Sequence, residues 1–209
     1  MASEEMGLTD LLKHGLEDMY YAEARIQKAL PKMIAAAQDE ELKRGLERHL
    51  EETAEQITML EEAFEAMGEK PRSEKCDAMD GILKEGDSLL QDFGGTAAGD
   101  AAIIFSCQAV EHYEIARYGS LRAYAELLGL DQVADLMNDI LEQEEAADEV
   151  AERSQAHVPL ADGCHGDGRV AQDGAGGDHG AAVVGARESH QDPGGQGHRR
   201  DVRVGVGVL

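Results

Sequence analysis

The 209-residue chain has no tryptophan, three phenylalanines and five tyrosines, so large aromatic side chains contribute little to its interior. It has no apolar run near the roughly 18 residues that a membrane-spanning helix requires. Its first residues, Met1 to Met6, form neither a basic segment nor an apolar one, which predicts no signal peptide. These absences predict a soluble protein whose core consists of leucine, isoleucine, methionine and alanine.

Cysteines and basic residues are also scarce. The three cysteines, Cys76, Cys107 and Cys164, are far apart, odd in number and without CxxC spacing, so they indicate no disulfide framework and fit a reducing compartment. Nineteen lysines and arginines face 43 acidic residues, for a net charge of −24. Such a charge makes nucleic acid and anionic membranes poor partners. We expect a cytoplasmic protein that binds neither.

The composition changes abruptly near Ser154. Residues 1–154 contain all seven lysines and 36 of the 43 acidic residues, whereas residues 155–209 contain no lysine, one glutamate and 13 of the 24 glycines. The second segment shows no helical or strand period and has too few apolar residues to offset its chain entropy. We therefore predict a folded domain over 1–154 and a disordered tail over 155–209.

The origin of this tail has three interpretations. The first is that the tail is a native, flexible, glycine-rich segment. The second is that it is the product of a GC-rich gene translated out of frame, and the abrupt loss of lysine and glutamate favours this interpretation. The third interpretation is a metal-binding tail, since five of the eight histidines lie there. Those histidines are scattered and lack ligand spacing, which counts against this third interpretation.

Residues 1–154 show the three-and-four spacing of apolar residues that is typical of amphipathic helices. The spacing predicts long helices over 8–37, 40–67, 97–128 and 131–154, and a shorter helix over 77–91. Gly68 and Gly129 are expected to end the second and third long helices. Two helical hairpins joined by one crossover of about 30 residues predict an all-α, ferritin-like four-helix bundle.

Glutamates interrupt the apolar rows of three long helices. Glu23 does so in the first helix, Glu111 and Glu114 in the third, and Glu144 in the fourth, and each has apolar residues one turn before and after it. An unpaired buried carboxylate is costly. Four of them on three helices at similar depth therefore indicate a shared counter-ion.

The second long helix contributes less clearly. Its apolar stripe, taken as Leu46, Leu50, Ile57, Leu60, Phe64 and Met67, has no acid at its centre. Glu52 and Gln56 lie to one side of that stripe, near His49, and are the expected contribution of this helix. A two-fold repeat supports them, since Glu23 and Glu52 are 29 residues apart, Glu114 and Glu144 are 30 apart, and Gln56 and Asp148 each follow the second glutamate by four residues.

Four or more carboxylates in a bundle core suit iron or manganese. Ferritin-like proteins hold such a pair with a glutamate from each of two helices and a Glu-x-x-His motif from each of the other two. This chain has no Glu-x-x-His there, and Gln56 and Asp148 stand about where the histidines are expected. The predicted metal ligands are Glu23, Glu52, Glu111, Glu114 and Glu144, with Gln56, Asp148 and His49 as further ligands or neighbours. The alternative is that these glutamates pair with Arg25, Arg117 and Arg122.

Six stretches of the chain resemble the YciE/YciF family of bacterial proteins, in the family's order, over about 8–152. They are Asp18-Met-Tyr-Tyr-Ala-Glu-Ala-Arg, Ala29-Leu-Pro-Lys-Met, His49-Leu-Glu-Glu-Thr, Lys75-Cys-Asp-Ala-Met-Asp-Gly, Val110-Glu-His-Tyr-Glu-Ile-Ala-Arg-Tyr-Gly and Glu144-Glu-Ala-Ala-Asp-Glu. The resemblance implies a fold like that of rubrerythrin and ferritin, an association with stress responses and a bound metal pair. It implies no particular reaction, because the activity of the family is unsettled.

Two functions follow from these observations. The first is a ferritin-like stress protein with a di-iron or di-manganese centre that acts on peroxide or Fe(II). The second is a non-catalytic, acidic helical bundle that serves as a structural or interaction protein. A homodimer is expected in either case.

Overall fold

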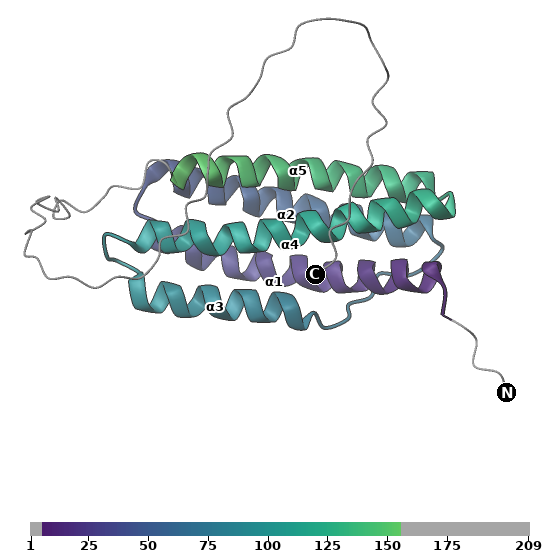
Figure 1. The fold of residues 1–209 in the computed structure, drawn as a ribbon, viewed down its shortest axis with the longest axis horizontal. Helices are drawn as coiled ribbons and strands as arrows, with labels where there is room; N and C mark the ends of the chain where they lie inside the picture. Colours follow the sequence, from purple (N-terminus) through teal and green to yellow (C-terminus); the bar gives the residue numbers. More distant parts are fainter. Residues whose placement is uncertain (1–5, 156–209) are drawn as a thin grey trace, which may run out of the picture. The chain divides into compact units, whose positions relative to one another are not determined.

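The computed structural model describes residues 6–155, which form five α-helices and, within that range, no strand (Figure 1). The helices are α1 (Leu8–Ala36), α2 (Glu40–Ala66), α3 (Asp77–Phe93), α4 (Gly99–Leu128) and α5 (Asp131–Gln155). The all-α, ferritin-like prediction is confirmed, with helix bounds close to those expected. Nearly all of the segment predicted as a tail lies outside the described residues. None of the five helices combines the length and the apolar sequence needed to cross a bilayer.

Four of the helices form a bundle of two antiparallel hairpins, α1 with α2 and α4 with α5. The hairpins pack together through α1 against α4 and α2 against α5. Gly15 marks the close approach of α1 to α4, because a Cβ at this position would lie 2.5 Å from a methyl carbon of Leu121. The turn within the second hairpin depends on Gly129, whose φ of +69° is the left-handed conformation that glycine adopts without strain.

The predicted core row of α1 is buried, and those of α4 and α5 are buried except for Cys107, Ala147 and Ala151, which are partly buried. The predicted stripe of α2 is only half right, since Leu46, Leu60 and Phe64 are buried. Leu50, Ile57 and Met67, which the stripe placed in the core, are only partly buried. The buried residues of α2 follow a row one step around the helix: Leu42, Leu46, His49, Thr53, Gln56, Leu60, Ala63 and Phe64. The middle of this helix therefore presents polar side chains to the bundle centre.

The crossover between the hairpins, residues 67–98, carries α3 along α1 and α4. It is anchored where three of the six family-like sequence stretches meet, those that contain Asp18, Cys76 and Tyr113. The Tyr113 hydroxyl of α4 donates a hydrogen bond to Asp18 Oδ2 of α1 at 2.8 Å and lies 3.0 Å from Cys76 Sγ. Cys76 in turn caps α3, since its sulfur accepts a hydrogen bond from Met79 N at 3.3 Å. This contact network gives Cys76 and Tyr113 a structural role.

Replacing Tyr113 with phenylalanine should lower the free energy of unfolding by about 1–2 kcal/mol, because the partly buried Asp18 carboxylate loses its donor. Urea denaturation followed by circular dichroism measures the change. The matched control is Tyr124→Phe on the same helix, whose hydroxyl makes no hydrogen bond among the described residues. Equal losses in the two variants would contradict the anchoring role of Tyr113.

Candidate metal centre

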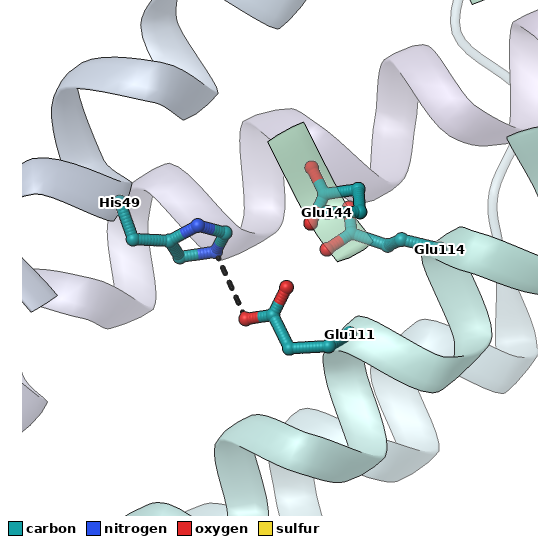
Figure 2. A group of neighbouring side chains, drawn as sticks. All are labelled: His49, Glu111, Glu114 and Glu144. Carbon is teal, nitrogen blue, oxygen red and sulfur yellow. Dashed lines mark ion pairs between the residues drawn. The ribbon is translucent and has the colours of Figure 1, made fainter. Parts of the chain in front are cut away.

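Side chains from three helices converge in the middle of the bundle. His49 of α2, Glu111 and Glu114 of α4, and Glu144 of α5 each offer a ligand atom, and these four atoms all lie within 4.8 Å of one another. Figure 2 shows the four side chains pointing toward a common centre, with the His49 ring facing the Glu111 carboxylate. Glu111 and Glu114 both face this centre because residues three apart lie on one face of a helix.

Glu23 of α1 completes the group. The Tyr118 hydroxyl donates a hydrogen bond to one of its carboxylate oxygens, and the Glu23 carboxyl is near those of Glu114 and Glu144. Glu23, Glu111, Glu114 and Glu144 are each at most 4 % exposed. The structure therefore brings together the four glutamates that interrupt the apolar rows. One comes from α1, two come from α4 and one comes from α5.

These carboxylates have few partners of their own. Both oxygens of Glu114, and one oxygen each of Glu23, Glu111 and Glu144, are buried without a hydrogen bond. Both ring nitrogens of His49 are in the same condition. Buried polar atoms are nearly always satisfied in folded proteins, and these unpartnered ligand atoms lie together where they could hold a metal ion.

Burial and mutual repulsion raise the pKa values of these acids when no ion is present. Burial, reinforced by the charge of Glu144, raises the pKa of Glu23 to about 8, although the hydrogen bond from Tyr118 opposes the shift. The pKa values of Glu111 and Glu114 are raised well above the usual range by burial and by neighbouring carboxylates. Burial also raises the pKa of Glu144. A cation would reverse these shifts.

His49 has the opposite shift. Burial, with a smaller contribution from the charge of Arg48, lowers its pKa to about 4. Its ring is therefore neutral at pH 7, which is the form that binds metal ions. Its Nε2 approaches Glu111 Oε1 to 3.4 Å without forming a hydrogen bond, and its Nδ1 lies 4.0 Å from Glu52 Oε2. His49, expected only as a further ligand or neighbour, is thus among the four converging side chains.

The remaining predicted residues lie around this centre. Glu52 stands at its partly exposed edge, beside Arg48 at 3.5 Å and His49. Gln56 is buried and donates a hydrogen bond from Nε2 to Glu144. Asp148 accepts a hydrogen bond from the exposed ring of His112 at 3.1 Å, if that nitrogen carries the proton. The structure therefore does not place Glu52, Gln56 or Asp148 among the four converging ligand atoms.

The three arginines of the alternative interpretation are engaged elsewhere. Arg25 pairs with Asp80 at 2.9 Å, Arg117 lies over the ring of Tyr113, and Arg122 binds Asn138. Within the described residues, no lysine or arginine forms an ion pair with any of the four buried glutamates. Basic side chains therefore do not supply the counter-charge there.

Two small cavities reach the same edge of the centre. One, of about 30 Å³, lies between α1, α3 and α4, and the other, of about 40 Å³, lies between α2, α4 and α5. Both are lined by His49, Cys107 and Glu111 and otherwise mainly by apolar side chains. Apolar surroundings lower the local dielectric constant, which strengthens the attraction between carboxylates and a bound cation.

The donor set has the chemistry of a site for divalent cations. Four ionised glutamates carry four negative charges, which two divalent cations neutralise, and a neutral imidazole adds a ligand without adding charge. Carboxylate-rich sites with one histidine suit iron or manganese, although this chemistry alone does not distinguish the two.

Comparison with known proteins places the chain in a family. Residues 7–156 match the family described as a domain of unknown function, DUF892. The protein YciF of Escherichia coli K12 is 38 % identical over 142 residues, which cover 68 % of this chain and 86 % of YciF.

Two solved structures have the same fold. The crystal structure of the E. coli stress protein YciF gives a TM-score of 0.71 at 35 % identity, over 74 % of this chain and 98 % of that one. YcfI of Rhodopseudomonas palustris, for which a structural role is suggested, gives 0.70 at 45 % identity, over 73 % and 97 %. The chain therefore belongs to the YciF family, which the DUF892 domain describes.

Proposed function

We propose that this protein is a bacterial stress protein that binds two iron or manganese ions in its bundle core and uses them against peroxide or Fe(II). The observation that supports this most is the set of buried ligand atoms without partners on Glu23, Glu111, Glu114, Glu144 and His49. The stress role comes from the similarity to YciF of E. coli. A cytoplasmic location remains a prediction.

In this proposal Glu23, Glu111, Glu114, Glu144 and His49 hold the two ions. A bound iron or manganese pair supplies one-electron redox chemistry that the side chains lack. Glu52 lies 4.0 Å from Nδ1 of His49 without a hydrogen bond, and it would orient the ring, as outer carboxylates do at many metal sites, once the two move closer.

Two further side chains position the ligands. Gln56 holds the Glu144 carboxylate through its amide, and Tyr118 holds Glu23 through its hydroxyl. Tyr118 is fully buried, so it also keeps bulk water from that side of the site. The fixed orientation of both glutamates reduces the reorganisation that metal binding requires.

The test is anaerobic titration of the full chain with Fe(II), and separately with Mn(II), followed by exposure of the iron form to peroxide or air. We expect about two ions per chain, a higher melting temperature and, after oxidation, near-ultraviolet absorption of an oxo-bridged iron pair. Five histidines lie beyond residue 155 and could also bind metal. The number of ions bound by the core is therefore the number bound by the wild type minus the number bound by Glu114→Gln.

A structural role, as suggested for YcfI, predicts a different outcome. The wild type and Glu114→Gln would then bind the same amount of metal, the melting temperature would not respond to either ion, and the spectrum would stay flat after oxidation. That result would overturn the proposed metal function and leave the fold and family unchanged.

A further inference from the structure

The metal centre proposed above is enclosed, since its four glutamates are each at most 4 % exposed. A divalent cation that reaches them must cross the surrounding layer of side chains, where an ion without counter-charge loses its hydration at a high cost. Glu52 of α2 and Asp148 of α5 lie in this layer, with side chains that are 25 % and 15 % exposed. Each carboxylate is therefore accessible both to solvent and to the interior of the bundle.

Glu52 and Asp148 lie at the same level of the contact between α2 and α5. The Gln56 amide of α2 donates a hydrogen bond to Glu144 of α5. The two helices pack together and run antiparallel (Figure 1). The residue four before Gln56 and the residue four after Glu144 are therefore displaced in the same direction, by one turn each. Those residues are Glu52 and Asp148, so their carboxylates flank one edge of the metal centre.

Both outer carboxylates act on the buried ones. Burial is the main cause of the raised pKa of Glu111, and the charge of Asp148 adds to it. Burial likewise raises the pKa of Glu144, and the charge of Glu52 adds to that shift. Each outer carboxylate is therefore near enough to a carboxylate of the centre to share a cation with it in passing.

Unpartnered ligand atoms connect this edge with the centre. His49 is 7 % exposed and neither of its ring nitrogens has a hydrogen bond. Its Nε2 faces Glu111 at 3.4 Å, whereas its Nδ1 faces Glu52 at 4.0 Å, so the ring has a ligand atom on either side. Asp148 Oδ1 is also buried without a partner, while Oδ2 lies 3.1 Å from the ring of His112. Such atoms indicate a ligand at the edge as well as at the centre.

The surroundings of this edge suit a hydrated cation. The cavity of about 40 Å³ between α2, α4 and α5 reaches it, because Arg48, His49 and Ala147 line that cavity, and it has room for more than one water molecule. Exposed carboxylates on the same two helices, such as Glu51 and Glu145, raise the local concentration of cations. A hydrated ion therefore meets negative charge and water-sized space on the way to the centre.

Arg48 pairs with Glu52 without blocking it. The guanidinium Nε lies 3.5 Å from Glu52 Oε1, and the Arg48 side chain is 50 % exposed. An exposed pair of this kind contributes about 1 kcal/mol or less. A divalent cation, with twice the charge of the guanidinium, therefore displaces Arg48 at little cost.

We propose that Glu52 and Asp148 form an entry site, at which a hydrated divalent cation is captured before it passes the His49 ring to the buried carboxylates. The inference rests on the proposed metal function and adds the route by which the centre is loaded. The two outer carboxylates govern the rate of loading and are not ligands of the loaded centre. Their removal therefore changes how fast metal binds and not how much is bound.

Stopped-flow absorption of Co(II) binding to the full chain tests this route, since Co(II) resembles Fe(II) in its ligand preferences and does not react with air. The core phase is the one that Glu114→Gln loses, which separates it from binding by the histidines beyond residue 155. Glu52→Gln and Asp148→Asn should each slow this phase at least about fivefold and leave the number of ions bound at equilibrium unchanged. The matched control is Glu51→Gln, at an exposed neighbour on α2, which should slow it less than about twofold.

Arg48→Gln gives a change of the opposite sign. It frees Glu52 and removes a positive charge, so the core phase should become faster, which a merely structural role of this pair would not produce. Equal rates in the wild type, Glu52→Gln and Asp148→Asn would overturn the entry site while leaving the metal function intact. Fewer ions at equilibrium in either variant would also overturn it, because the residue would then be a ligand. A wild type without a core phase would overturn the metal function and the entry site together.

Discussion

Replacing Glu114 with glutamine is expected to weaken metal binding by the core while making the metal-free protein more stable. Glu114 is fully buried, and neither of its carboxylate oxygens has a hydrogen-bond partner. Burial, reinforced by repulsion from Glu23, Glu144 and Glu111, raises the pKa of Glu114. Glutamine has nearly the same shape but no charge, so it removes both the cost of burying a carboxylate and this repulsion. Near pH 8 the metal-free variant should gain roughly 1–3 kcal/mol in free energy of unfolding.

The same change removes a ligand, so affinity for Fe(II) or Mn(II) should fall at least about tenfold, the loss that even an outer-shell residue can cause. Titration calorimetry and urea denaturation, with and without metal, measure the two effects. Glu145→Gln is the matched control, because Glu145 adjoins Glu144 but is exposed. A Glu114→Gln protein that unfolds more easily without metal and binds metal as tightly as the wild type would contradict the ligand role.

The fold could be predicted from the sequence because three of the four bundle helices have a single unambiguous apolar row. On α1 that row runs from Leu12 to Met33 and is buried throughout. Within residues 6–155, its one acidic member, Glu23, and the corresponding glutamates of α4 and α5 are the buried carboxylates. An acid within such a row is therefore an informative signal, because its burial follows from that of its neighbours.

Helix α2 could not be predicted in the same way because it carries two competing rows. Leu50, Ile57 and Met67 make one row look more apolar, yet all three are only partly buried. The other row places His49, Thr53 and Gln56 in its middle, which resembles a solvated face. Both rows keep steps of four and three, so spacing alone does not distinguish them. The packing of the bundle decides that His49 lies inward and Glu52 at the edge.

Contacts between distant segments could not be predicted from the sequence for a different reason. The meeting of Asp18, Cys76 and Tyr113 depends on the path of the crossover, which no local pattern encodes. The pairing of Arg25 with Asp80 also depends on the path of the crossover. Because Arg25 is engaged with Asp80, it does not neutralise Glu23. The sequence therefore predicts which acids lie in the core, but only the tertiary structure shows that no basic side chain pairs with them there.

The pKa shifts of these acids predict that the metal-free protein loses stability as the pH rises from about 6.5 to about 8. Glu23 has a pKa raised to about 8, and those of Glu111 and Glu114 are raised well above the usual range, so the folded state keeps protons that the unfolded chain has released. Raising the pH through the folded-state values therefore favours unfolding. His49 has the opposite effect on the free energy of unfolding, because its pKa in the folded protein is lowered to about 4. This effect no longer changes with pH above about 6.5, where the histidine of the unfolded chain has also lost its proton.

Above about pH 6.5 the carboxyls thus act alone, and the free energy of unfolding should fall by roughly 1–3 kcal/mol by pH 8. The prediction ends at pH 8 because burial raises the pKa of Cys107 to about 12 in the folded protein. At higher pH this cysteine would lose its proton only in the unfolded chain, which would lower the free energy of unfolding further. Urea denaturation in the presence of a chelator measures the effect. In excess Mn(II) the dependence should reverse, because metal binding requires ionised carboxylates and strengthens as they deprotonate. A metal-free protein whose stability is constant or rises across this range would show that the four glutamates are ionised without metal, and the orphaned oxygens would then need another partner.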